Sequence, residues 1–340
     1  MEPMKDAIRV VDADAHARDL DECLRPYLPE PFRSRTAGFM PREPYDRNLG
    51  GTLGHKGAQP EERLSAMDRQ EIDTAVLYPT GGLAIGRVRE ATYQAALCRA
   101  YNDFIADYCK ASPRLKAVAN LPVYSPGDAV KELNRAVTEL GLVGAMLAAQ
   151  AHNRNLGSPE FYPLYEEAQR LGVPLAMHAF GGDEAGSDIF DQFICIHTTG
   201  HPFPVLRQLT GMVFGGIPEL FPELKLAYLE IGCGWLPYWM DRMDEEWEKR
   251  GKVEAPLCKK KPSEYLTKEQ FYYGVEPEER TMGYVVGEIG SRNLLYASDY
   301  PHWDMSWPES AVLIWQRDDL SVDAKKDILE NNARRLYNMS

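Results

Sequence analysis

Short apolar runs alternate with longer stretches of helical period along most of the chain. "IRVVDAD" at residues 8–14 and "TAVLYPT" at 74–80 are apolar runs of strand length. By contrast, "EERLSAMDRQEID" at 61–73 and "SPGDAVKELNRAVTELG" at 125–141 repeat apolar residues every three or four positions, as amphipathic helices do. This alternation predicts parallel strands that are covered on both faces by the helices connecting them.

About eight such runs are present, and helical patterns separate them. The runs cover residues 8–14, 74–80, 115–123, 142–150, 173–180, 224–232, 271–276 and 293–302, and the helical patterns cover 61–73, 89–112, 125–141, 159–172, 235–250, 282–290 and 321–338. Eight parallel strands favour a closed (β/α)8 TIM barrel over an open doubly wound sheet. No GxGxxG motif follows a strand to indicate a dinucleotide site. We therefore predict an α/β fold with one barrel domain over residues 1–340, a usual length for such a barrel with insertions.

Two segments interrupt this rhythm. Residues 30–60 are rich in Pro, Gly and Arg, and residues 181–200 read "GGDEAGSDIFDQFICIHTTG". Long segments without regular structure inside a compact domain often serve as lids or binding loops. We expect both to be inserted loops of this kind.

Charge and cysteine content narrow the classes of partner. The formal net charge of −13 argues against nucleic acid and anionic membranes, because phosphate binding relies on clustered Lys and Arg. The six cysteines lie at scattered spacings without a CxxC pair, so we expect reduced thiols. No apolar run reaches the length needed to cross a bilayer, and no signal peptide is evident. These features predict a cytoplasmic protein with a small-molecule substrate, and they leave a homodimer open.

Ionisable residues occupy the carboxyl ends of several predicted strands. Asp14 and His16 close the first strand, His178, Glu230 and Asp299 end later strands, and His201 and His302 lie in loops beyond strands. An ionisable group buried there is costly unless it is paired or holds a metal. The carboxyl ends of barrel strands meet at one face, so these side chains should converge. Imidazoles and carboxylates bind zinc, manganese or non-haem iron, which predicts one or two divalent metal ions per chain.

The first strand carries Asp12, Asp14 and His16 at alternate positions. Side chains two apart point to the same face of a strand, so Asp14 and His16 can supply two ligands to one cavity. We expect Asp12 to be a structural partner near the strand end. A single His after an apolar run is more often a core or loop residue, and Asp299 or Glu230 alone could serve a turn. Their joint occurrence at separate strand ends favours the metal site. His55, His152 and His197 end no apolar strand and receive no role.

Five segments together resemble the amidohydrolase superfamily, in the amidohydrolase-2 branch that includes aminocarboxymuconate-semialdehyde decarboxylase-like enzymes. The segments are "DADAH", "PLAMHAF", "HPFPVLRQLTGMVFGGIPELFPELKLAYLEIGCGWLPYWMDRMDE", "YASDYPHWD" and "NNARRLY", and the resemblance runs from residue 8 to 338. It implies a (β/α)8 barrel binding one or two divalent metals. The implied ligands are Asp14 and His16 as the first-strand pair, His178 from the fifth strand and Asp299 from the last.

Two features depart from the family pattern. Decarboxylases of the branch usually carry a catalytic His after the sixth strand, where this chain has Glu230. His201 and His302 add imidazoles beyond those that a single metal needs.

Three functions remain open at this point. The first is a metal-dependent hydrolase or non-oxidative decarboxylase of a small cyclic or aromatic acid, amide or lactone, with Asp299 as general base or acid and Glu230 or His302 assisting. Five aromatic residues near the predicted mouth would suit a flat substrate, although core packing explains at least half of them: Trp235, Tyr238, Tyr300, Trp303 and Trp307. The second is a dinuclear non-haem iron oxygenase (hydroxylase) on the same fold. The third, an inactive barrel with a binding role, predicts loss of ligand residues that this chain retains.

Overall fold

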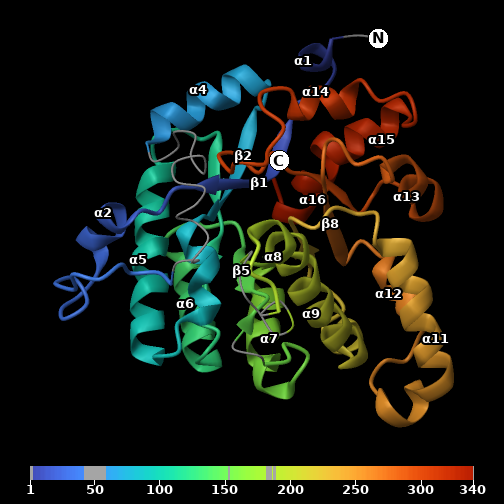
Figure 1. Cartoon of the computed structure of the whole chain (residues 1–340), viewed down its shortest axis with the longest axis horizontal. Coiled ribbons are helices and arrows are strands. Elements are labelled where there is room, and N and C mark those ends of the chain that lie inside the picture. Colours follow the sequence, from blue (N-terminus) through green and yellow to red (C-terminus); the bar gives the residue numbers. More distant parts are fainter. Residues whose placement is uncertain (1–2, 42–58, 152–153, 181–185, 187–188, 340) are drawn as a thin grey trace.

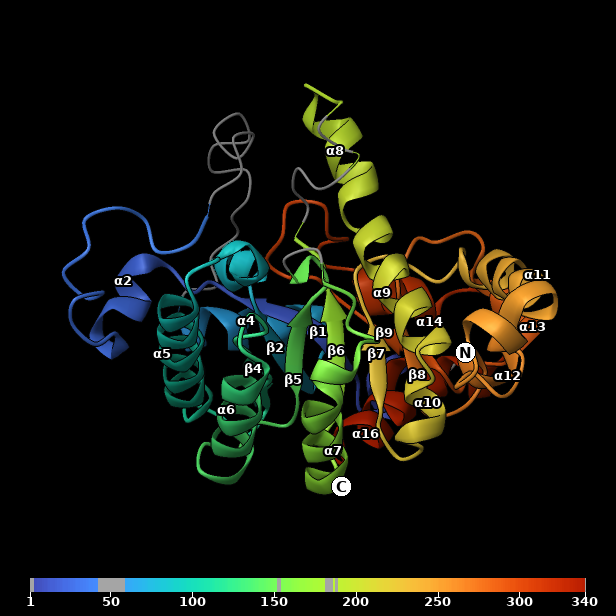
Figure 2. The ribbon, with the colours of Figure 1, turned by 90° about the horizontal axis from the view of Figure 1, so that it is seen from below.

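The chain folds as an α/β barrel with parallel strands at its centre and helices around them (Figures 1 and 2). The computed structural model describes residues 3–41, 59–151, 154–180, 186 and 189–339. The strands are β1 (Val11–Ala17), β2 (Thr74–Pro79), β3 (Leu115–Ala117), β4 (Ala119–Asn120), β5 (Ala145–Ala148), β6 (Leu175–His178), β7 (Leu226–Tyr228), β8 (Phe271–Val275) and β9 (Leu294–Tyr296). They confirm the predicted α/β barrel.

The strands pair in sequence order, all in parallel. One sheet runs β1-β2-β3 and the other β4-β5-β6-β7-β8-β9. The predicted run 115–123 contains both β3 and β4, which only Val118 separates. Its N–H donates to the carbonyl of Leu77 in β2 (3.1 Å), so the two pieces occupy one strand position. The eight predicted runs therefore correspond to eight strand positions.

Backbone hydrogen bonds also connect the last strand position with the first. The N–H of Asp299 donates to the carbonyl of Asp14 (3.1 Å), and the N–H of His16 donates to the carbonyl of Tyr300 (2.8 Å). The segment just after β9 thus lies beside β1. These two hydrogen bonds place the segment after the last strand against Asp14 and His16.

Helices cover the outside of the strands. The longer ones are α4 (Pro60–Gln70), α5 (Ala91–Cys109), α6 (Pro126–Thr138), α7 (Tyr162–Leu171), α8 (Phe193–Gly200), α9 (Pro202–Phe214), α11 (Leu236–Glu254) and α13 (Met282–Ile289). The shorter ones are α1 (Met4–Ala7), α2 (Asp21–Leu24), α10 (Ile217–Leu220), α12 (Pro262–Leu266), α14 (Ser310–Trp315), α15 (Val322–Lys326) and α16 (Asn332–Tyr337), with a π-helical segment, Asp327–Asn331, before α16. All seven predicted helical segments contain helix.

Local sequence signals explain several helix ends. Pro126 occupies the first turn of α6, where its missing N–H costs nothing, and Gly172 ends α7 in a left-handed conformation (φ 69°). The carboxylate of Glu90 caps α5 by accepting hydrogen bonds from the N–H groups of Thr92 and Tyr93. Among the described residues, none of the helices is both long and apolar enough to cross a membrane.

The prediction of a structureless loop over residues 181–200 is wrong in part. Phe193–Gly200 forms α8, which continues into α9 and stands out from the body on the side to which β5 and β6 point (Figure 2). Residues 181–185 and 187–188 lie outside the described part of the chain. Of the other predicted insertion, residues 30–41 form turns and irregular backbone, and 42–58 lie outside the described residues.

The cysteines behave as expected. All six are free thiols: Cys23, Cys98, Cys109, Cys195, Cys233 and Cys258.

Candidate metal centre

The carboxyl end of β1 supplies the first two members of the centre. The strand is buried along its whole length, and its pairing with β2 shifts register between Asp12 and Ala15. His16 Nε2 lies 3.6 Å from Asp14 Oδ1, so the two side chains share one cavity as their spacing predicts. His16 Nδ1 lies 2.8 Å from the carbonyl oxygen of Pro79 at the end of β2. That contact fixes the ring and directs Nε2 into the cavity.

β6 and β7 contribute the next pair. His178 is the last residue of β6, and its Nδ1 lies 3.0 Å from its neighbour's carbonyl, Ala179 O. Its Nε2 is therefore the nitrogen that faces the cavity, 2.8 Å from Glu230 Oε2 and 3.7 Å from Asp14 Oδ2. Glu230 stands two residues beyond the end of β7. The two strands thus bring an imidazole and a carboxylate into contact.

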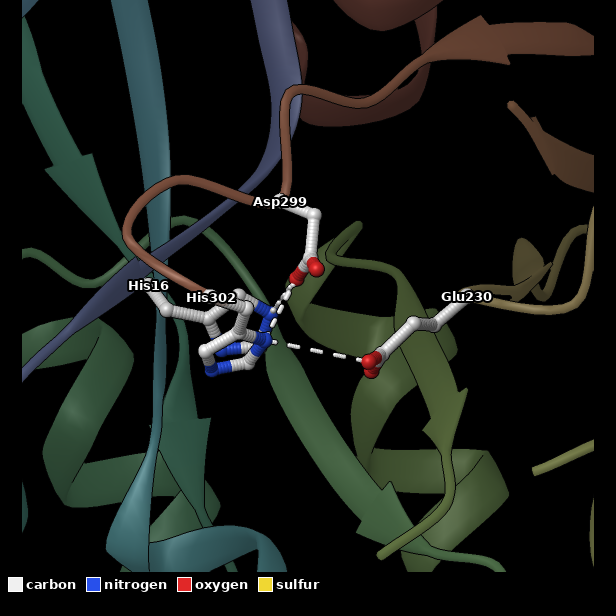
Figure 3. Close-up of side chains that lie close together, drawn as sticks. All are labelled: His16, Glu230, Asp299 and His302. Carbon is white, nitrogen blue, oxygen red and sulfur yellow. Dashed lines mark ion pairs between the residues drawn. The ribbon is translucent and has the colours of Figure 1, made fainter. Parts of the chain in front are cut away.

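The turn after β9 carries Asp299 and His302. His302 Nδ1 lies 2.6 Å from Asp299 Oδ1, and the N–H of His302 donates to the carbonyl of Asp299 (2.8 Å). Asp299 Oδ1 also lies 3.2 Å from His16 Nε2, and His302 Nδ1 lies 3.7 Å from Glu230 Oε1. Figure 3 shows Asp299 and Glu230 approaching the two imidazoles from different directions.

His201 enters from α8 and α9, at whose junction it lies. Its Nδ1 is 3.5 Å from Glu230 Oε1. The structure therefore brings together all seven side chains that the sequence singles out: Asp14, His16, His178, His201, Glu230, Asp299 and His302. Their side chains are at most 13% exposed.

Two of these residues have unusual backbone conformations. Glu230 and Asp299 adopt left-handed φ values of 57° and 55°, which residues other than glycine rarely do. The turn after Glu230 is held by the Glu279 carboxylate, which accepts the N–H of Cys233 (2.9 Å). Such strained residues persist where the surrounding structure determines them, and they cluster at functional sites.

Six buried polar atoms in the centre make no hydrogen bond of good geometry within the described part of the chain, although imidazole nitrogens and carboxylate oxygens among them lie at ion-pair distance from one another. They are Asp14 Oδ1, His16 Nε2, His178 Nε2, His201 Nδ1, Glu230 Oε2 and Asp299 Oδ1. Unsatisfied buried polar atoms are rare in native proteins because each costs free energy. Imidazole nitrogens and carboxylate oxygens that point into one cavity are the ligands that a divalent cation prefers. The residues present therefore fit a metal.

The protonation states of the metal-free centre also favour the binding of a cation. Burial lowers the pKa of His16, and of His201, to about 4, which keeps both imidazoles neutral. Burial also opposes protonation of His178, but the carboxylates of Glu230 and Asp14 raise its pKa to about 9. Burial opposes ionisation of Glu230 as well, yet the imidazoles around it, of which His178 is a protonated one, hold the pKa of its carboxyl well below the usual range. Without a cation, a proton on His178 therefore partly balances the carboxylates.

Sequence reasoning missed two residues beside the centre. The ring of His197 lies 4.7 Å from the ring of His201, one helical turn along α8, and its Nε2 lies 3.8 Å from Asp304 Oδ2. Burial, together with the carboxylates of Asp299 and Glu230, raises the pKa of Asp304 to about 7. The four-residue spacing of His197 and His201 on one helix face was the available signal. His55 and His152 lie outside the described residues.

Asp12 is hydrogen-bonded to backbone N–H groups beside the centre. Its Oδ1 accepts the N–H of Ser298 (3.0 Å) and the N–H of Asp14 (3.3 Å), which joins β1 to the turn after β9. This arrangement agrees with the expected structural role.

The five aromatic residues divide between packing and the site. The ring of Trp303, a 40% exposed residue, lies 5.4 Å from the ring of His197. Tyr300 is buried against Trp307, with ring centres 5.1 Å apart. Trp235 packs on Tyr273, and Tyr238 is 65% exposed on the outer helix α11. Trp303 is the member that stands beside His197, which itself packs on His201 of the centre.

Comparison with known proteins identifies the family. The amidohydrolase family model, Amidohydro_2, matches residues 11–339. The chain therefore belongs to the amidohydrolase family, as the resemblance in its sequence predicts.

Several relatives are decarboxylases. The chain is 26% identical over 276 residues to a 2-amino-3-carboxymuconate-6-semialdehyde decarboxylase from Dictyostelium discoideum, covering 81% of this chain and 75% of that protein. It is also 26% identical over 318 residues to a gamma-resorcylate decarboxylase from Polaromonas sp. strain JS666, covering 90% and 94%. The crystal structure of a 5-carboxyvanillate decarboxylase from Novosphingobium aromaticivorans, with bound manganese, superposes with a TM-score of 0.76 at 18% identity, covering 97% of each chain. None of these names indicates an oxygenase, so that alternative gains no support from these relatives.

Proposed function

We propose that the protein is a metal-dependent, non-oxidative decarboxylase of small aromatic acids that carry a hydroxyl group beside the carboxylate. The observation that carries this proposal is the buried set of unsatisfied ligand atoms at the carboxyl ends of β1, β6, β7 and β9. Gamma-resorcylate and 5-carboxyvanillate, the substrates in the names of two similar proteins, share the hydroxyl-carboxylate arrangement. Two adjacent oxygens on a ring are a natural chelating pair for one cation.

Four residues would hold the cation: Asp14, His16, His178 and Asp299. When bound, a divalent cation supplies a Lewis acid that attracts the carboxylate and phenolic oxygens of the substrate. The protein's own contribution is position: His16 and His178 are each fixed through Nδ1 by a backbone carbonyl. The side chains that form the site are also largely buried, which limits their contact with solvent.

Asp299 is the residue best placed to move a proton. Both of its ion pairs, with His16 and His302, use Oδ1, which leaves Oδ2 for the substrate. Burial opposes its ionisation, but the neighbouring His302 lowers the pKa of Asp299, so its carboxylate is ionised and able to accept a proton. It can take the phenolic proton and then donate it to the ring carbon that bears the carboxylate. The carbon–carbon bond then breaks, its electron pair returns to the ring, carbon dioxide leaves, and the phenolate takes a proton from water.

Glu230 occupies the position at which the decarboxylase pattern has a catalytic histidine. It does not take over the role of that histidine. Its carboxylate contacts His178, His201 and His302. Burial alone would raise the pKa of Glu230, but the neighbouring imidazoles lower it by more. Both of its oxygens face imidazoles, so Glu230 orients and balances them, whereas the ion pairs of Asp299 leave its Oδ2 for proton transfer. The proton transfers therefore fall to Asp299, with Glu230 and His302 assisting through contact.

The test is decarboxylation of a panel of acids by protein loaded with Mn²⁺ or Zn²⁺. We expect carbon dioxide release from 2,6-dihydroxybenzoate or 5-carboxyvanillate and none from benzoate, which has no phenolic proton. Asp299→Asn keeps the shape of the side chain but removes the base, so the rate should fall by about 10²–10⁴-fold. Hydrolysis of cyclic amides or lactones without carbon dioxide release from any acid would instead assign the hydrolase reaction.

A further inference from the structure

We propose that Asp19 is a positioning residue of the centre, because its carboxylate holds the β2 turn (residues 79–82), and that turn orients the imidazoles of His16 and His302. Asp19 lies two residues beyond the end of β1 and is 5% exposed. The proposal rests on the proposed function in one respect, that His16 binds the cation. The hydrogen bonds that carry it belong to the metal-free protein.

The β2 turn contacts both imidazoles from one side. The carbonyl of Pro79, the last residue of β2, lies 2.8 Å from His16 Nδ1. Because a carbonyl oxygen only accepts, Nδ1 carries the proton, and Nε2 is the nitrogen left for a cation. The next residue places Thr80 Oγ1 3.4 Å from His302 Nε2. The two rings lie 4.0 Å apart, centre to centre (Figure 3), so a shift of this turn would move both.

The Asp19 carboxylate accepts three consecutive backbone N–H groups of this turn. Its Oδ1 accepts the N–H of Thr80 (2.9 Å) and the N–H of Gly81 (2.6 Å), and its Oδ2 accepts the N–H of Gly82 (2.8 Å). The two glycines begin the 3₁₀ segment η2 (Gly81–Arg87), and the first N–H groups of a helical segment have no acceptor inside it. Asp19 therefore supplies the acceptor that fixes the start of η2 to the end of β1.

The charge of Asp19 suits this role. Burial raises the pKa of Asp19 to about 6, and the N–H groups of Gly81, Gly82 and Thr80 oppose that rise. The carboxyl is therefore mainly ionised at neutral pH, and both of its oxygens accept hydrogen bonds. Hydrogen bonds to an ionised acceptor are roughly twice as strong as those between neutral groups.

The turn is also held from its other side. Asn120 Nδ2 donates to the carbonyl of Gly82 (2.9 Å), and the N–H of Asn120 donates to Asn102 Oδ1 (2.8 Å). A Cβ atom at Gly82 would lie 2.7 Å from Asn120 Nδ2, 2.7 Å from Pro79 Cβ and 3.0 Å from Asp19 Oδ2. Such distances are shorter than van der Waals contact. The turn therefore fits between Asp19 and Asn120 in one position.

The experiment replaces Asp19 in the full-length protein and follows His16. Nuclear magnetic resonance of metal-free protein with ¹⁵N-labelled histidine detects the His16 Nδ1–H, and the signal is assigned by its absence from His16→Gln. Titration with Mn²⁺ measures metal affinity. Asp19→Ala should shift or remove the signal and lower the affinity by about 10–100-fold. Asp19→Asn keeps an oxygen for Thr80 and Gly81 and should fall between Asp19→Ala and the wild type.

Asp244→Ala is the control for a general loss of stability. The Asp244 carboxylate accepts the N–H (2.9 Å) and the hydroxyl (2.7 Å) of Ser263, and it joins the outer helices α11 and α12. Its loss should lower the unfolding temperature and leave the His16 signal and the Mn²⁺ affinity as in the wild type. This control separates positioning of the centre from support of the fold.

Two neighbouring glycines give a second test, which remains decisive if Asp19→Ala fails to fold. Gly82→Ala must displace the turn, so it should also shift the His16 signal and lower the affinity. Gly81→Ala is its matched control, because a Cβ atom there lies 3.4 Å from Asp19 Oδ1, an ordinary contact. It should behave as the wild type.

The outcomes separate this proposal from the proposed function. An Asp19→Ala or Gly82→Ala protein with the wild-type signal and affinity would overturn the positioning role. An equal loss of affinity in Asp244→Ala would assign the effect to stability and overturn it as well. A wild type that binds no Mn²⁺ would contradict the proposed function, whereas the His16 signal of the metal-free protein would still decide whether Asp19 orients the ring.

Discussion

The guanidinium group of Arg63 donates a hydrogen bond to the carbonyl oxygen of Tyr300 across 2.7 Å. It also donates to the carbonyl of His16, and its central carbon lies 4.3 Å from the centre of the Tyr300 ring. Arg63 comes from α4 and is completely buried. One side chain thus ties the end of β1 to the turn after β9, the two segments that carry His16 and Asp299.

Replacing Arg63 should therefore disturb both stability and metal affinity. Arg63→Met removes two charge-assisted hydrogen bonds to buried carbonyls, so the free energy of unfolding should fall by about 3 kcal/mol. Metal affinity should fall by about 10–100-fold, as it does when groups that hold ligands are lost. Urea unfolding and metal titration measure the two effects. Arg69→Lys, an exposed change on the same helix, should alter neither; an Arg63→Met variant with wild-type affinity would refute the positioning role.

Asp12 offers a test of structural against ligand roles within β1. Asp12→Asn keeps a carbonyl oxygen that can accept the N–H groups of Ser298 and Asp14, so metal content should stay near that of the wild type. Asp12→Ala leaves both donors unpaired in the interior and should cost about 2 kcal/mol of unfolding free energy. Calorimetry and elemental analysis check the pair of variants. Loss of metal in Asp12→Asn would show that Asp12 is itself a ligand.

Metal binding should release a proton near neutral pH. Burial opposes the charged form of His178, but Glu230 and Asp14 raise its pKa to about 9, so the metal-free imidazole is protonated below that pH. A ligand imidazole must be neutral, and the cation therefore displaces this proton. Affinity should rise with pH up to about 9, by at least about tenfold per pH unit, because burial also raises the pKa of the Asp14 carboxyl, a second proposed ligand that must lose its proton. Calorimetric titration in two buffers of different ionisation enthalpy counts the protons; a pH-independent affinity between 6 and 9 would contradict the assignment.

The sequence predicts the barrel well because hydrophobic period is a local property. Each strand position overlaps a predicted apolar run, although β1 extends three residues past the end of its run, and the ligand-type residues follow from the rule that strand ends meet at one face. Asp14 and His16 needed only their spacing of two to be placed in one cavity.

The features that could not be predicted from the sequence depend on the path of the backbone beyond the strand ends. Glu230 and Asp299 lie past the ends of β7 and β9 in left-handed conformations, so strand alternation says nothing about where their side chains point. α8 was missed because "FICIHTTG" is apolar and β-branched, which weakens its helical pattern. His197 was missed with it. Arg63 was overlooked because a basic residue on an amphipathic helix usually faces water, whereas here it turns into the core.

The cation itself is tested most directly through His178. Elemental analysis of protein purified without added metal should find zinc, manganese or iron in the wild type at one or more ions per chain. His178→Ala should lose most of this metal while its circular dichroism spectrum stays that of the folded barrel. A folded His178→Ala protein that retains the full metal content, or a wild type that binds no divalent cation at any concentration tested, would contradict the account.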